Sequence, residues 1–123
     1  MGDIILVEDN ESLSRSYGLA LEQAGHLVRR ASNEAQLRAH LADRLPELLI
    51  LDVGLPGVDG LEIIRGLRQE PATAGLTIAV LSNYGDRDII HRALRLDVVE
   101  YVEKSATSPL LLAAEVRRWL ERR

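Results

Sequence analysis

Short runs of aliphatic residues alternate along this chain with longer stretches in which apolar residues recur at every third or fourth position. The short runs predict five β-strands, at residues 3–7, 26–31, 48–52, 76–82 and 98–104. The run at 26–31 (HLVRRA) is the more polar one, so we expect it near an edge of its sheet. Continuous aliphatic strands are typical of a parallel sheet that is covered on both faces.

The longer stretches predict five helices, one after each strand. The first runs from Glu11 to about Gly25, and glycine suits its carboxyl end. Either Ser32 or Asn33 can cap the second, which ends near Arg44. The third opens at residue 60 or 61 and ends at 71, and the fourth covers about 86–96. The fifth starts at 108–109, where serine followed by proline favours a helix start.

Five strand–helix units in this order predict an α/β fold. The expected architecture is a doubly wound, five-stranded parallel sheet flanked by five helices. Such sheets bind their ligands beyond the carboxyl ends of the strands. Functional residues are therefore expected where the strands end.

Composition limits the classes of function. The 123 residues fit one domain over positions 1–123, and 46% hydrophobic with 28% charged residues is typical of a globular chain. A net charge of -4 and 3% aromatic residues argue against nucleic-acid binding by this chain alone. The sequence has no cysteine for disulfides or thiolate metal sites, and no apolar run approaches the ~20 residues of a membrane span. We expect no membrane contact and a cytoplasmic location.

Polar residues gather at the ends of four predicted strands. They are Glu8, Asp9 and Asn10, then Asp52, then Ser82 and Asn83, and finally Glu103, Lys104 and Ser105. Taken alone, each has a simpler interpretation: Asp9 or Asn10 can cap the first helix, and a single lysine is most often solvated. Together they bring carboxylates, a hydroxyl and an ammonium group to one rim of one sheet.

This set of side chains suits phosphoryl transfer. Three carboxylates held close together repel one another unless a cation neutralises them, and an acidic site made of oxygens suits Mg²⁺. Lys104 adds a second positive charge. Between these cations Asp52 can attack phosphorus and become an acyl phosphate, while the Ser82 hydroxyl bonds a phosphoryl oxygen.

In their order and on their strands, these motifs resemble the receiver domain of two-component response regulators over essentially the whole chain. The matching segments are LVEDN at 6–10, LLILDVGLPGVDG at 48–60, VLSN at 80–83, AL at 93–94 and YVEK at 101–104. The resemblance implies a flavodoxin-like fold with strand order 2-1-3-4-5. It also implies a phosphoacceptor function in phosphorelay signalling.

The resemblance assigns roles to the matching residues. Asp52 would accept the phosphoryl group from a phosphohistidine on a histidine kinase or a histidine phosphotransfer protein. Mg²⁺ would be held directly by Asp9 and Asp52, mainly through water by Glu8, and by the backbone carbonyl of Gly54. Lys104 would contact the phosphoryl group. The chain would act as an acceptor with slow autodephosphorylation rather than as a turnover enzyme.

The resemblance also implies a switch. Ser82 would move toward the phosphoryl group, Tyr101 would change rotamer to fill the space, and the fourth helix would shift to control a partner or a fused output domain. A homodimer is a further form that the family allows. Gly54, Asn83 and Tyr84 occupy positions that tune dephosphorylation, and here we expect a long-lived phosphoform, since Gly54 has no side chain to position water.

Three positions depart from the family pattern. The family usually has a cis Lys-Pro bond where this chain has Lys104-Ser105. A non-proline cis bond costs about 3 kcal/mol, so we expect Lys104 to be aimed differently or to be held by a strained bond. Asn83 replaces a small residue beside the phosphoryl position, and Asp97-Val98 replaces Gly-Ala at a left-handed helix end.

Other functions fit less well. A phosphatase of the haloacid dehalogenase type would need a second aspartate at the position of Gly54, and no nucleotide-binding glycine motif occurs. The alternative that stays open is a receiver-like interaction module that acts without phosphorylation.

Overall fold

The strands form one parallel sheet. The structure, a computed structural model, describes residues 2–83 and 87–122. In the order β2-β1-β3-β4-β5, the sheet contains β1 (Asp3–Val7), β2 (Leu27–Ala31), β3 (Leu48–Asp52), β4 (Ile78–Ser82) and β5 (Glu100–Glu103). Both the predicted order and the edge position of the polar strand are confirmed. Leu27 on that edge strand is 55% exposed, whereas β3 and β4 are buried throughout.

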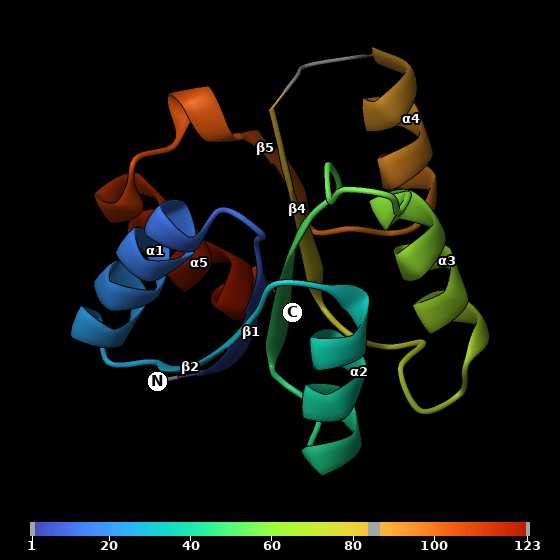
Figure 1. Cartoon of the computed structure of the whole chain (residues 1–123), viewed down its shortest axis with the longest axis horizontal. Helices are drawn as coiled ribbons and strands as arrows, with labels where there is room; N and C mark the ends of the chain where they lie inside the picture. Colours follow the sequence, from blue (N-terminus) through green and yellow to red (C-terminus); the bar gives the residue numbers. More distant parts are fainter. Residues whose placement is uncertain (1, 84–86, 123) are drawn as a thin grey trace.

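Helices cover both faces of the sheet, as predicted. They are α1 (Glu11–Gln23), α2 (Glu34–Asp43), α3 (Gly60–Gln69), α4 (Arg87–Arg95) and α5 (Pro109–Arg122), with a short 3₁₀ turn, η1 (Lys104–Ala106), after β5. Helices α1 and α5 lie on one face and α2, α3 and α4 on the other (Figure 1). In the part of the chain that the structure describes, no helix is long and apolar enough to cross a membrane.

Alternation along the strands builds two cores. On β1, Ile4 and Leu6 pack with α1 and α5 around Trp119, whereas Ile5 and Val7 pack with α2, α3 and α4. This follows from the two-residue period of a strand, which sends successive side chains to opposite faces. The two buried layers hold the strand ends rigidly at one rim.

The structure decides between the open helix caps and moves several element ends. Asn10 caps α1, its side chain accepting from Leu13 N at 3.0 Å, so Asp9 is not used for capping. Asn33 caps α2 in the same way, accepting from Gln36 N at 2.9 Å. Helix α1 ends at Gln23, two residues before the predicted end, and β4 and β5 are shorter than predicted. The predicted start of α4 at 86 lies outside the described residues.

The turn after α4 has the left-handed conformation expected there. Asp97 has a φ of 60°, a conformation that costs a non-glycine residue about 1 kcal/mol. The Arg68 guanidinium lies beneath the turn and donates to the carbonyl oxygens of Leu96 and Asp97, at 2.8 and 3.0 Å. These bonds offset the strain, while Val98 fits into the core.

Candidate functional site

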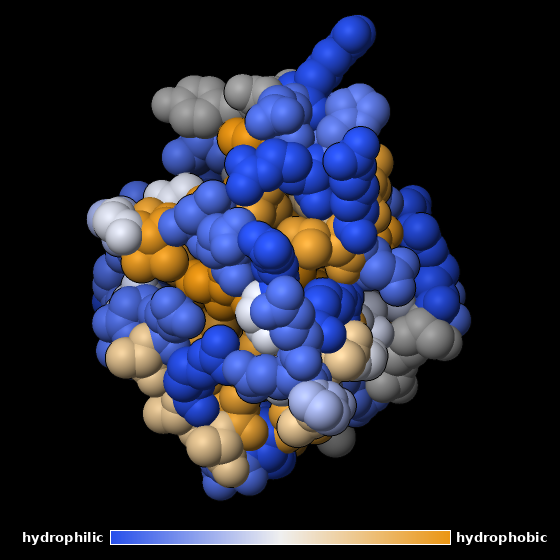
Figure 2. Space-filling model, turned by 90° about the vertical axis from the view of Figure 1, so that its right-hand side faces the viewer, coloured by the Kyte–Doolittle hydropathy of each residue, from blue (hydrophilic) through white to orange (hydrophobic). Residues whose placement is uncertain are grey.

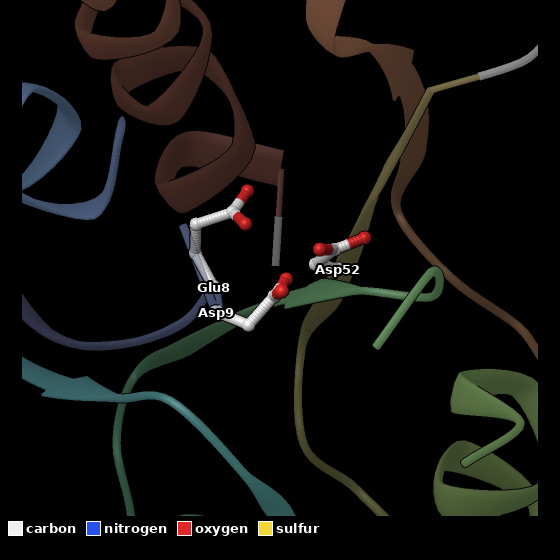
Figure 3. Close-up of side chains that lie close together, drawn as sticks. All are labelled: Glu8, Asp9 and Asp52. Atoms are coloured by element: carbon white, nitrogen blue, oxygen red, sulfur yellow. The ribbon is translucent and has the colours of Figure 1, made fainter. Parts of the chain in front are cut away.

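An acidic cluster lies at the carboxyl ends of two adjacent interior strands, β1 and β3. Glu8, Asp9 and Asp52 each place a carboxylate oxygen within 4.8 Å of the others (Figure 3). The strand register explains this, because Val7 pairs with Leu51 and each strand then ends in an acid. Glu8 and Asp52 are each 1% exposed, whereas Asp9 faces solvent.

Lys104 follows the carboxyl end of β5, and its side chain reaches this cluster across the rim of the sheet. Its Nζ lies 2.7 Å from Asp52 Oδ2 and 2.7 Å from Glu8 Oε1. It is the only lysine in the sequence. One ammonium group facing three carboxylates leaves the cluster with an excess of negative charge, and oxygen ligands with that charge fit a divalent cation such as Mg²⁺.

Burial and pairing shift the pKa values of two members. Burial raises the pKa of Glu8, although the ammonium group of Lys104 and a hydrogen bond from the backbone N–H of Asn10 partly oppose this. For Lys104, burial alone would lower the pKa, but pairing with the carboxylates of Asp52 and Glu8 outweighs it and raises the pKa. Lys104 is therefore a fixed positive charge at neutral pH.

The second oxygen of Asp52 also has a donor. Asp52 Oδ1 accepts a hydrogen bond from the backbone N–H of Gly54 at 2.8 Å. A Cβ added at Gly54 would lie 3.3 Å from that same oxygen and 4.0 Å from Asn83 Nδ2. The missing side chain therefore leaves the space above Asp52 open. That the Gly54 carbonyl binds metal stays a prediction.

The cluster lies in a hollow of about 430 Å³. The residues lining it are Glu8, Asp9, Asn10, Leu13, Asp52, Gly54, Asn83, Lys104 and Ser105. Both unusual residues, Asn83 and Ser105, are among them. Of the two alternatives expected for Lys104-Ser105, the strained cis bond does not occur, because no cis peptide is present among the described residues. Lys104 reaches Asp52 through a trans peptide bond.

The two predicted switch residues lie on the next strands of the sheet, Ser82 one strand and Tyr101 two strands away from Asp52. Ser82 is buried at the end of β4, one residue beyond Leu81, which pairs with Asp52. Tyr101 on β5 pairs with Val80, is half-buried and packs against the core beneath α3 and α4. Side-chain alternation thus sends Ser82 and Tyr101 toward the α4 face. Tyr84 lies outside the described residues.

The loop after β3 is fixed by contacts that the sequence does not reveal. Asp59 caps α3 through Leu61 N at 2.9 Å, and its other oxygen accepts from Arg92 of α4 at 3.2 Å. Gly60 passes so close to Val53 that an added Cβ would lie 2.4 Å from the Val53 Cα. A glycine after a capping residue is the signal for the close approach, but nothing in the sequence marks Arg92 as a partner.

Comparisons with known proteins agree with this geometry. The family model "Response regulator receiver domain" matches residues 4–115. The chain is 40% identical over 110 residues to the phosphate regulon transcriptional regulatory protein PhoB of Rhizobium meliloti, covering 89% of this chain and 48% of that protein. It thus spans about half the length of the curated relatives it matches.

Solved structures agree as well. A response regulator from Thermotoga maritima superposes with a TM-score of 0.84 at 27% identity, covering 97% of each chain. The Mn²⁺-bound form of the response regulator Rcp1 superposes with a TM-score of 0.83 at 26% identity, covering 98% of this chain and 96% of that one. The chain belongs to the receiver domains of two-component response regulators.

Proposed function

We propose that residues 1–123 act as one phosphoacceptor domain, in which Asp52 takes a phosphoryl group from a phosphohistidine donor. The observation that carries this proposal is the buried carboxylate of Asp52, held 2.7 Å from the ammonium group of Lys104 and beside two further acids. An oxygen of Asp52 attacks phosphorus while the phosphorus–nitrogen bond of the donor breaks. The electron pair stays on the imidazole nitrogen, which takes up a proton, and Asp52 becomes an acyl phosphate.

Mg²⁺ is the cofactor that the acidic residues suit. Asp9 would bind it directly and Glu8 mainly through water, and Asp52 and the Gly54 carbonyl would complete the protein ligands. The excess negative charge of the cluster and the Mn²⁺-bound state of the relative Rcp1 support this assignment. When bound, the cation neutralises charge that builds up on the transferring phosphoryl oxygens.

Lys104 and Ser82 contact the oxygens of the phosphoryl group after its transfer to Asp52. In the structure Lys104 pairs with Asp52 Oδ2, the oxygen that would otherwise be free to react. Transfer therefore requires the ammonium group to move from this oxygen to a phosphoryl oxygen. The buried Ser82 hydroxyl at the end of the neighbouring strand donates to a second phosphoryl oxygen.

Movement of Ser82 is the start of the output signal. It draws in the segment after β4, Tyr101 fills the space, and α4 changes its position. The ion pair between Arg92 of α4 and Asp59 of the β3–α3 loop also couples the position of α4 to the loop that follows Asp52. A shift of a few kcal/mol changes the population of the active form by orders of magnitude.

The phosphoform is long-lived, because Gly54 offers no side chain to position water, while Asn83 at the edge of the hollow shields the acyl phosphate. Slow autodephosphorylation by this chain is its only turnover. The donor is a histidine kinase or phosphotransfer protein of the cytoplasm. The receiver controls an effector or a fused output domain, alone or as a homodimer, and does not itself contact nucleic acid or membrane.

Intact mass spectrometry tests the proposal. Incubation with acetyl phosphate and Mg²⁺ should add one phosphoryl group. The addition should disappear on chelation of the metal and in Asp52→Asn. Absence of any gain, from acetyl phosphate or from histidine kinases, would favour the interaction module that works without phosphorylation.

A further inference from the structure

A buried hydrogen bond joins α1 to the segment that follows Lys104. Tyr17 on α1 is completely buried, and its hydroxyl donates to the carbonyl oxygen of Thr107 at 2.7 Å. The two residues are 90 positions apart. Burial raises the pKa of Tyr17, so its hydroxyl keeps the proton that it donates.

Thr107 in turn is hydrogen-bonded to the last residue of β5 and to Lys104. Its backbone N–H donates to the carbonyl oxygen of Lys104 at 3.2 Å, and its Oγ1 donates to that of Glu103 at 2.6 Å. Thr107 is buried, whereas Ser105 and Ala106 at the outside of the turn are exposed. The backbone of Lys104 is therefore held by Thr107, the buried residue of the turn, and not by the exposed residues 105 and 106.

The position of this backbone decides where the ammonium group goes. Lys104 Nζ has to lie 2.7 Å from acids on two different strands, Glu8 after β1 and Asp52 on β3. A small displacement of the turn would break this double contact. The Tyr17 bond links the turn to a helix that packs in the same core as β1.

We propose that Tyr17 is a positioning residue for Lys104, acting through Thr107 to hold the ammonium group at the phosphoacceptor. The inference rests on the proposed phosphoacceptor function of Asp52. It adds a residue outside the acidic cluster whose hydroxyl contributes to phosphoryl transfer without touching the reacting atoms.

The chain supplies a direct readout and a matched control. Because Lys104 is the only lysine, labelling with ¹⁵N-lysine gives a single side-chain ammonium signal. Thr73→Val is the control, because it removes another buried hydroxyl-to-carbonyl bond, 2.6 Å long, from Thr73 to Leu67. Thr73 precedes β4, at the end of the sheet opposite to the acidic cluster.

The experiment compares wild type, Tyr17→Phe and Thr73→Val with acetyl phosphate and saturating Mg²⁺. Tyr17→Phe should phosphorylate about tenfold more slowly, and its ammonium signal should shift or broaden, since small misplacements of a catalytic group have such effects. Thr73→Val should match wild type in both measurements. Should Tyr17→Phe fail to fold, Thr107→Val, which removes the bond to Glu103, carries the same expectation.

A Tyr17→Phe rate within twofold of wild type would overturn the inference, and so would a slower rate with an unchanged ammonium signal. If wild type takes up no phosphoryl group, the proposed function fails instead. The ammonium signal then still reports whether Tyr17 holds Lys104: an altered signal in Tyr17→Phe supports the positioning contact, and an unaltered one contradicts it.

Discussion

Lys104 Nζ lies 2.7 Å from Asp52 Oδ2, although the two residues are 52 positions apart in the chain. The same nitrogen contacts Glu8, so one ammonium group serves two buried carboxylates. In the unphosphorylated protein Lys104 is therefore a structural counter-ion for two acids, and only after phosphorylation would it contact a phosphoryl group. The first role needs only a buried positive charge, whereas the second needs the ammonium group at a phosphoryl oxygen.

Replacing Lys104 by methionine should destabilise the protein. The variant leaves Glu8 and Asp52 buried without their cation, and breaking a buried pair in this way costs about 3–5 kcal/mol. Urea unfolding without metal measures the loss, and added Mg²⁺ should restore part of it by binding only the folded state. Arg15→Met is the control, because its ion pair with Glu11 is exposed to solvent and adds little to stability. A loss at Lys104 no larger than that of the control would refute the counter-ion role.

Gly60→Ala should disturb the loop that follows Asp52. The new Cβ would lie 2.4 Å from the Val53 Cα, so the backbone must shift. We expect a loss of about 1–3 kcal/mol in the free energy of unfolding and slower phosphorylation of Asp52. Gly75→Ala serves as the control, because its Cβ meets nothing within 4 Å. Equal effects of the two substitutions would contradict the packing argument.

Gly54→Asn should shorten the life of the phosphoform. Its Cβ would lie 3.3 Å from Asp52 Oδ1, close enough for an amide to position a water against the acyl phosphate. Loss of the phosphoryl group, followed by intact mass after the donor is removed, gives the half-life. A half-life in Gly54→Asn equal to or longer than that of wild type would rule out this effect.

His26 should make the protein less stable as the pH falls. Its Nδ1 accepts from the backbone N–H of Gly2 at 3.0 Å, and burial lowers the pKa of His26 below its ordinary value of 6.5. Below that value the unfolded chain binds more protons than the folded one, so the free energy of unfolding decreases from about pH 7 to pH 5. His26→Asn should flatten this part of the profile. An unchanged slope in His26→Asn would contradict the assignment.

The sheet was predictable from the sequence because its determinants are local. Aliphatic runs identify the strands, and each ends directly at a polar residue, so Asp52 and Glu8 necessarily meet at one rim. The space-filling view of the α2–α4 side shows why helix surfaces are harder to read. On that side, hydrophobic residues are visible at the surface between hydrophilic ones (Figure 2).

Side-chain contacts between segments far apart in the sequence were not predictable. The spacing of Tyr17 along α1 indicates a core residue but not a partner for its hydroxyl. The hydrogen bond to Thr107 forms only when α1 packs against the β5–α5 segment. The missing proline at Ser105 suggested a misdirected or strained lysine, yet Lys104 reaches Asp52 across a trans bond.

The most direct test of the account is to locate the phosphoryl group. Wild-type protein phosphorylated with acetyl phosphate and Mg²⁺ is reduced with borohydride, which converts an aspartyl phosphate into homoserine, and is then digested and sequenced by mass spectrometry. The account predicts homoserine at residue 52 and at no other acidic position. Homoserine at residue 9, or aspartate unchanged at residue 52 in protein shown to carry a phosphoryl group, would contradict it.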